Sequence, residues 1–170
     1  MLLWYFWIYS FLGYLLEKLF AKVTRAAQQG RKCFLLLPLC PVYGLGMLAV
    51  LALPLEGVWL LLWGGFAATA VEYGVHWFYE TLFCVRFWDY SHVRGNLHGR
   101  VCLPFSLVWG VLTALAVRWV QPGVRWFAMQ TIPAVTGLCL AVFAVDAMLS
   151  AKQLRRTGDA ESLRADRRGR

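Results

Sequence analysis

Three ionisable side chains stand four residues apart in a long apolar stretch of the sequence. They are Glu72, His76 and Glu80. A spacing of four places the three groups on one face of a helix. Counting about 1.5 Å per helical residue back from the end of the stretch puts Glu72 near the middle of a membrane. Carboxyl and imidazole groups at that depth can carry protons or bind a cation, so the pattern predicts a path for a substrate or ion.

Two further acids, Glu17 and Asp146, are predicted at the same inner edge of the membrane as Glu80. One interpretation is that these acids line the mouth of the path. The other is that they pair with basic side chains at that depth and fix the helices against one another. The candidate basic partners are Lys18, Arg31, Arg86 and Arg100. No basic residue is expected at the depth of Glu72 and His76, which favours a functional role for those two.

The densest polar stretch is 86–100, with the sequence RFWDYSHVRGNLHGR. Its mixture of aromatic, acidic, amide and arginine side chains is typical of an ordered loop that folds over another part of the protein. Several roles are open for this loop. It caps the neighbouring helices, or it gates the path or docks a partner, or its arginines bind a phosphate or carboxylate. The candidate residues are Arg86, Trp88, Asp89, Tyr90, Asn96 and Arg100, with Arg94 as a further arginine.

Motifs for catalysis are absent from the sequence. It contains no phosphate loop G-x-x-x-x-G-K-[ST], no H-E-x-x-H, no G-x-G-x-x-G and no Ser-His-Asp signature. The five cysteines include no C-x-x-C pair, so free thiols are expected and a metal site is not. The sequence therefore predicts neither a cofactor nor an enzyme activity.

Composition indicates an integral membrane protein. The chain has 170 residues, of which 60% are hydrophobic and 16% aromatic, more apolar surface than a soluble domain of this length buries. About five segments are long enough to cross a hydrocarbon core of about 30 Å, and the first is expected to be retained rather than cleaved. These segments are Leu2 to Phe20, Leu35 to Leu53, Val58 to Phe83, Leu103 to Val120 and Trp126 to Ser150. We therefore predict an all-α transmembrane domain over 1–150 and a basic cytoplasmic tail over 151–170.

The distribution of basic residues predicts the orientation of these spans. Lysine and arginine gather in the first and third connections and in the tail, and basic loops stay in the cytoplasm during insertion. The N-terminus is therefore expected outside and the C-terminus inside. The net charge of +8 reflects this topology, so binding of nucleic acid is not expected. Contact between the tail and anionic lipid headgroups is consistent with it.

Three short sequence motifs, called words below, occur twice in the same order and predict a duplicated helical hairpin. The repeats are expected over 2–53 and 58–120 and are parallel, because both hairpins start outside. Pro38 and Pro104 are predicted to start the returning helices. Pro41 adds the expectation that residues 33–41 enter the membrane region in non-helical form. The words are E-x-L-F at 17–20 and 80–83, G-R-x-C at 30–33 and 99–102, and L-P-x-x-x-V-[YW]-G at 37–44 and 103–110.

Several phrases in the sequence resemble a known family. Residues 9–17 read YSFLGYLLE, 40–44 read CPVYG, 88–91 read WDYS and 96–103 read NLHGRVCL. In these the chain is similar to the CmpB-like family of small bacterial membrane proteins, described as "putative ABC-transporter type IV" permeases. The resemblance extends to about Ser150. It implies a transport role, and a separate ATP-binding subunit, because the sequence itself has no ATP-binding motif.

Together these observations predict a permease or transport component of the bacterial cytoplasmic membrane. The protein is expected to be multi-pass, to contact membrane lipid and to form a homo- or hetero-oligomer, because five short spans enclose little volume. Two alternatives from other classes remain open. One is an intramembrane lipid-headgroup-binding protein or enzyme, with the acids and arginines of the inner mouth holding a phosphorylated lipid. The other is a non-catalytic membrane assembly factor.

Overall fold

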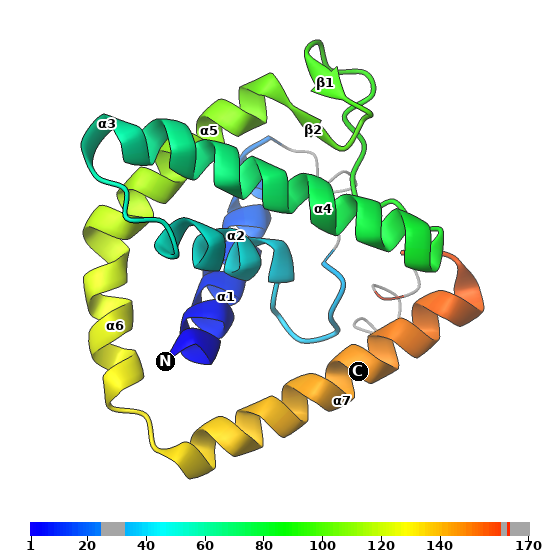
Figure 1. The fold of residues 1–170 in the computed structure, drawn as a ribbon. Helices are drawn as coiled ribbons and strands as arrows, with labels where there is room; N and C mark the ends of the chain where they lie inside the picture. Colours follow the sequence, from blue (N-terminus) through cyan, green and yellow to red (C-terminus); the bar gives the residue numbers. More distant parts are fainter. Residues whose placement is uncertain (25–32, 161–162, 164–170) are drawn as a thin grey trace.

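The computed structural model describes residues 1–24, 33–160 and 163, and these form a mostly helical protein (Figure 1). Two short antiparallel strands, β1 and β2, pair Asn96 with Cys102 and Leu97 with Val101. The basic residues Arg25, Arg31 and Lys32, and most of the predicted tail beyond residue 160, lie outside the described residues. The elements are α1 (Leu2–Val23), α2 (Pro41–Leu51), α3 (Gly57–Trp59), η1 (Leu60–Gly64), α4 (Gly65–Phe83), β1 (Asn96–Leu97), β2 (Val101–Cys102), α5 (Leu103–Leu115), η2 (Ala116–Val120), α6 (Gln121–Met129) and α7 (Pro133–Thr157).

Three helices of the described chain are long and apolar enough to cross a membrane: Gly57–Phe83, Leu103–Met129 and Pro133–Thr157. The predicted all-α membrane class is therefore supported. α1 has 22 residues but is not among the three, and α2 has 11. At about 1.5 Å per residue, α2 covers only about half of a hydrocarbon core. The count of five spans, their orientation and the repeat remain predictions.

The second predicted segment, 35–53, differs from the structure at its start. α2 begins at Pro41, so Pro38 does not start the returning helix. Of the stretch 33–41 predicted to be non-helical, residues 33–40 are non-helical and Pro41 belongs to α2, while its entry into the membrane remains a prediction. Because the residue before a proline disfavours helical geometry, Cys40 is extended, with φ −116° and ψ 92°. Pro41 then occupies the first turn, where its missing N–H is not needed.

Backbone groups of the 33–40 segment are bound by side chains and backbone of other elements. The Leu37 N–H donates to the Asp146 carboxylate at 3.2 Å and the Leu36 N–H donates to Ser150 Oγ at 3.3 Å. The Cys40 N–H donates to the Ser10 carbonyl at 2.9 Å. Non-helical backbone inside a membrane protein persists only where such partners exist, so α1 and α7 hold this entry segment in place.

The fourth and fifth predicted segments also have different bounds. Helix continues from Leu103 through η2 and α6 to Met129, so the expected end near Val120 is wrong, and the fifth helix starts at Pro133 rather than near Trp126. η2 is a π-helical turn, and Pro122 falls in the first turn of α6 just after it. A widened turn accommodates a proline that would interrupt a regular α-helix. Figure 1 shows the resulting change of direction between α5 and α6. Pro104, in contrast, starts α5 as predicted.

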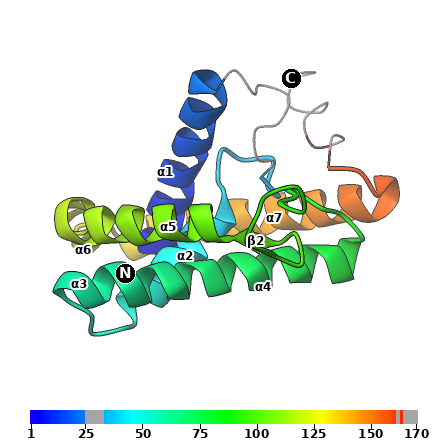
Figure 2. The same ribbon diagram turned by 90° about the horizontal axis from the view of Figure 1, so that it is seen from above.

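The helices do not form a simple up-and-down bundle. α4 and α5 lie side by side and run in opposite directions, and α7 lies in the same layer (Figures 1 and 2). Figure 2 shows α1 crossing this layer steeply. α7 contacts α1 through Thr136, which accepts a hydrogen bond from Trp4 Nε1 at 2.9 Å, and through Phe143. Its far end packs against α4 through Leu154.

Glycines allow close backbone contact in both helical hairpins. A Cβ atom on Gly44 of α2 would lie 2.5 Å from the Phe6 carbonyl oxygen of α1. A Cβ atom on Gly110 of α5 would lie 2.6 Å from the Leu61 carbonyl oxygen of η1, and one on Gly65 would lie 2.8 Å from the Cα atom of Gly110. Small residues at helix contacts let two backbones pack against each other in lipid, so these positions set the spacing within each hairpin.

Gly110→Ala should lower stability because the added methyl group meets backbone, which cannot rotate away. We expect a loss of about 1–3 kcal/mol, seen as a lower unfolding temperature of the purified protein in detergent. Gly74→Ala is the matched control, since a Cβ atom there has nothing within 4 Å. Equal unfolding temperatures for the two variants would contradict the close packing of α5 on η1.

Candidate functional site

The segment after α4 folds back over the polar face of that helix. We name residues 84–102 the cover segment. It begins at Cys84, whose left-handed backbone, with φ +53°, ends α4 and turns the chain around. Each predicted polar residue of α4 then meets a residue of the first part of the cover segment, 86–90. These pairs are Glu80 with Arg86, His76 with the Trp88 carbonyl and Glu72 with the Tyr90 hydroxyl.

The spacing of these three contacts follows from backbone geometry. Successive contacts use every fourth residue of the helix, a rise of about 6 Å, and every second residue of the non-helical stretch 86–90. This stretch therefore runs back along α4 with about one contact per helical turn. The intervening Phe87 is buried in an apolar cluster with Tyr79 and Phe83.

Glu72 is completely buried, with 0% of its surface exposed. Its Oε2 accepts a hydrogen bond of 2.6 Å from the indole N–H of Trp109 in α5, and its Oε1 accepts one of 3.3 Å from the Tyr90 hydroxyl. Trp109 also packs on Tyr43 of α2, with ring centroids 4.9 Å apart. Tyr43 in turn donates a 2.6 Å hydrogen bond to Glu17. The two predicted acids Glu17 and Glu72 thus bind the two members of one aromatic pair.

His76 is buried at 2% exposure and has a defined orientation. Its Nε2 lies 2.9 Å from the Trp88 carbonyl oxygen. A carbonyl can only accept, so Nε2 carries the proton and Nδ1 is an acceptor in the neutral ring. Nδ1 has no hydrogen-bond partner among the described residues and lies 3.9 Å from Glu80 Oε2. His76 therefore offers a buried basic nitrogen next to a carboxylate.

Glu80 holds two arginines of the cover segment. Oε1 accepts a hydrogen bond from Arg86 Nε at 2.9 Å and forms an ion pair with Arg86 Nη2 at 2.6 Å. Oε2 accepts hydrogen bonds from Nε and Nη2 of Arg100 at 3.0 and 2.9 Å. Arg100 Nη1 also donates to the Tyr73 hydroxyl at 2.7 Å, and that hydroxyl lies 2.9 Å from His98 Nδ1. The Glu80 carboxylate raises the pKa of Arg100. Of the two interpretations, ion pairing is the one observed for Glu80.

Hydrogen bonds inside the cover segment keep it folded. The Trp88 indole N–H donates to the Arg100 carbonyl at 2.9 Å, and the Asn96 amide donates to the Val93 carbonyl at 2.7 Å. The Ser91 N–H donates to Asp89 Oδ1 at 2.8 Å, and this hydrogen bond holds the pKa of Asp89 below its usual value. Gly99 has φ +68°, and a Cβ atom there would lie 2.9 Å from Asp89 Oδ1. The W-D-Y-S and N-L-x-G-R phrases therefore specify one compact loop.

The other predicted site residues are distributed more widely. Asp146 binds the Leu37 N–H of the entry segment, so it contacts a different element from Glu80. Arg94 is exposed. Within the ranges that the structure describes, no three His, Cys, Asp or Glu side chains come together as metal ligands. The predicted role of Glu72, His76, Glu80, Glu17 and Asp146 as a substrate or ion path remains a prediction.

Trp109, Tyr43 and Tyr73 are site residues that the sequence analysis did not identify. Trp109 and Tyr43 occupy the aromatic position of the repeated L-P-x-x-x-V-[YW]-G word, which was a usable signal. The match between two-residue spacing in 86–90 and four-residue spacing in 72–80 was another. No sequence pattern marked Tyr73, because its hydrogen bond with Arg100 depends on where the folded cover segment places that arginine.

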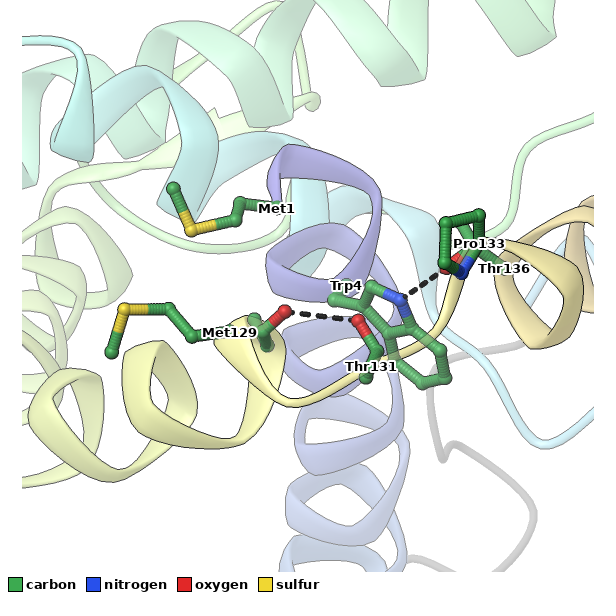
Figure 3. A pocket seen from close by; sticks show the side chains of 7 residues that line it. Met1, Trp4, Met129, Thr131, Pro133 and Thr136 are labelled. Atoms are coloured by element: carbon green, nitrogen blue, oxygen red, sulfur yellow. Dashed lines mark hydrogen bonds between the residues drawn. The ribbon is translucent and has the colours of Figure 1, made fainter.

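A groove of about 500 Å³ lies apart from this site, between the start of α1 and the connection from α6 to α7 (Figure 3). Two hydrogen bonds cross its lining: Trp4 Nε1 donates to Thr136 Oγ1, and Thr131 Oγ1 donates to the Ala128 carbonyl. It contains none of the predicted site residues. Its lining residues are Met1, Trp4, Ala128, Met129, Thr131, Pro133 and Thr136.

The apolar helices and the buried ionisable face of α4 define the class as a helical membrane protein. The chain belongs to the family described as "Putative ABC-transporter type IV", whose model matches residues 4–151. The resemblance to the CmpB-like family is thereby confirmed. The family name describes a membrane component of the ABC-transporter type and hints at association with other transporter components. No curated protein and no solved structure is significantly similar to the chain.

Arg100→Gln should loosen the cover segment, because Arg100 donates hydrogen bonds to both Glu80 and Tyr73. Hydrogen bonds to a charged partner contribute roughly 1.5–3 kcal/mol, so we expect amides of 86–100 to exchange with solvent about tenfold faster. Hydrogen exchange with mass spectrometry measures this. Arg94→Gln, which removes the same charge from an exposed position, should leave the exchange unchanged; a similar acceleration there would contradict the role of Glu80.

Asp89→Asn should weaken protection of the Ser91 amide only while Asp89 is ionised. The lowered pKa of Asp89 means that its carboxylate stabilises the loop above the ordinary carboxyl pKa of about 3.9, and that this contribution disappears as pH falls through the lowered value. The difference between wild type and variant, followed by amide exchange, should therefore be present at neutral pH and vanish in acid. A difference that does not depend on pH would contradict this assignment.

Proposed function

We propose that this protein is a multi-pass component of a transporter in the bacterial cytoplasmic membrane. In this proposal the cover segment controls access to the polar face of α4. The observation that carries it is the alignment of Arg86, Trp88 and Tyr90 along that face. All three members of the predicted path on α4 are contacted by this one segment, and Glu80 is contacted by two of its arginines.

Burial of Glu72 and His76 supports a role beyond packing. Ionisable groups inside a membrane protein are costly, so each needs a partner or a function. Both groups are covered by the cover segment, which connects α4 to α5. It is held to α4 by the polar contacts described above and by the burial of Val85 and Phe87 in the cluster with Phe83. In our proposal the stretch after Phe87 lifts while α4 and α5 stay together. Lifting it would open Glu72, His76 and Glu80 to a substrate or ion, with Glu17 and Asp146 nearer the mouth.

The duplication supports the same proposal with a revised register. Glu17 binds Tyr43 as Glu72 binds Trp109, and the Phe6 carbonyl faces Gly44 as the Leu61 carbonyl faces Gly110. Phe6 and Leu61 are separated along the chain by the same number of residues as Glu17 and Glu72. We therefore align Glu17 with Glu72, whereas the E-x-L-F word aligns it with Glu80.

Energy for transport would come from a separate ATP-binding subunit. The sequence contains no phosphate loop, and the family name is that of an ABC-transporter type. We keep the predicted orientation, with the N-terminus outside and the C-terminus in the cytoplasm, and an oligomeric assembly. In that orientation the cover segment faces the cytoplasm, where an ATP-binding subunit would act. The comparisons support neither alternative function, the intramembrane lipid-headgroup-binding protein or enzyme and the membrane assembly factor.

Glu72→Gln should abolish transport while leaving the fold intact, because the amide nearly preserves shape but removes the charge. Cells that express the wild-type protein should differ from control cells in the distribution of at least one small molecule or ion between cell and medium. Mass spectrometry of both compartments identifies that species. The Glu72→Gln variant should match cells without the protein.

Glu56→Gln is the matched control, since Glu56 is exposed before α3 and lies outside the cover segment. It should transport like wild type. Membrane insertion and the unfolding temperature of each variant are measured in parallel. Normal transport by a well-folded Glu72→Gln variant would refute the assignment of the α4 face as the path.

A further inference from the structure

We propose that the adjoining ends of α4 and α7 bind the headgroup of an anionic phospholipid. Figures 1 and 2 show the C-terminal ends of these two helices next to each other. Phe83 of α4 and Leu154 of α7 share one buried cluster there. Two arginines flank this cluster, Arg155 from α7 and Arg86 from the start of the cover segment. The inference needs only that both helices span the membrane, so it does not depend on the proposed transport function.

Arg155 is placed over an aromatic ring. Its guanidinium carbon lies 5.9 Å from the ring centroid of Phe83. A guanidinium that lies over a ring face is attracted by it, while its N–H groups stay available for acceptors around the edge of the group. The side chain is thus held at the contact between the two helices with donors available for a phosphate.

An ion pair with Glu80 positions Arg86 but leaves some of its N–H donors available. Nε and Nη2 bind Glu80 Oε1, and 58% of the side chain remains exposed. A guanidinium carries five N–H donors, so further donors of Arg86 are available for a second acceptor. Because Glu80 already fixes the side chain, little conformational entropy is lost when a phosphate binds.

Apolar side chains continue from the two arginines toward the middle of the membrane. Phe78 on α4 is 50% exposed and contacts Phe83, with ring centroids 6.3 Å apart. Met148 on α7 is 63% exposed and lies two turns before Arg155 on the same helical face. A phosphate at the arginines would therefore place acyl chains along exposed apolar surface. This pattern, cationic at the helix ends and apolar below them, fits a phospholipid better than a free anion.

The charge balance at this place remains favourable to an anion. The C-terminal end of each helix carries the equivalent of about half a negative charge, and Glu80 and the exposed Asp159 add one each. Arg86 and Arg155 are joined on α7 by Lys152 and Arg156. Basic side chains near a membrane surface contribute about 1 kcal/mol each toward anionic lipid, so the cationic side chains outweigh the helix ends.

Native mass spectrometry of the full-length protein in detergent tests the proposal. Wild-type protein should retain phosphatidylglycerol in preference to phosphatidylcholine. Arg155→Gln should weaken phosphatidylglycerol binding about tenfold, as expected for one lost charged hydrogen-bonding group. Arg155→Lys keeps the charge but not the planar fork, and should fall between the two.

Arg125→Gln is the matched control, because Arg125 is exposed on α6, away from the ends of α4 and α7. It removes the same charge and should bind phosphatidylglycerol like wild type. Equal weakening by both substitutions, or equal retention of the two lipids by wild type, would overturn the proposal. Complete displacement of phosphatidylglycerol by inorganic phosphate would also overturn it, since it would indicate a site for free phosphate. The lipid comparison on wild type holds even where Arg155→Gln lowers stability.

Discussion

The two oxygens of the Glu80 carboxylate determine the course of the cover segment. One oxygen binds Arg86 at the start of the cover segment and the other binds Arg100 near its end. A buried or half-buried carboxylate requires such partners, and each arginine equally requires an acceptor. One side chain therefore fixes both ends of the loop to α4. Once they are fixed, the Trp88 carbonyl and the Tyr90 hydroxyl fall opposite His76 and Glu72.

Sequence reasoning succeeded where a pattern depends on backbone period alone. The shared face of Glu72, His76 and Glu80 follows from helical spacing, and Pro104 starts a helix because its N–H is not needed there. The predicted helix bounds were wrong where more than one proline could start a helix or where a proline could be accommodated within one. Pro41 rather than Pro38 starts α2, and Pro122 is tolerated after a π-helical turn, so segment bounds shifted. The partners of the polar residues were equally out of reach, because they depend on where distant segments pack.

Neutral aromatic donors explain how a carboxyl group is accommodated among apolar helices. The Trp109 indole and the Tyr90 hydroxyl bind Glu72, and the Tyr43 hydroxyl binds Glu17. Such donors bring large apolar surfaces with them, so a polar contact and close packing are met by the same side chain. The repeated aromatic position at Tyr43 and Trp109 thus marks contacts that join the two hairpins.

The steep crossing of α1 has a consequence for biogenesis. α1 leaves the ribosome first, yet many of its partners are translated much later. Trp4 binds Thr136, Tyr9 donates a 2.8 Å hydrogen bond to Gln121, and Phe20 packs near Phe105. These contacts can form only after the later helices have been synthesised, whereas the packing of α1 on α2 can form earlier. The surroundings of α1 are therefore complete only once α7 has been made.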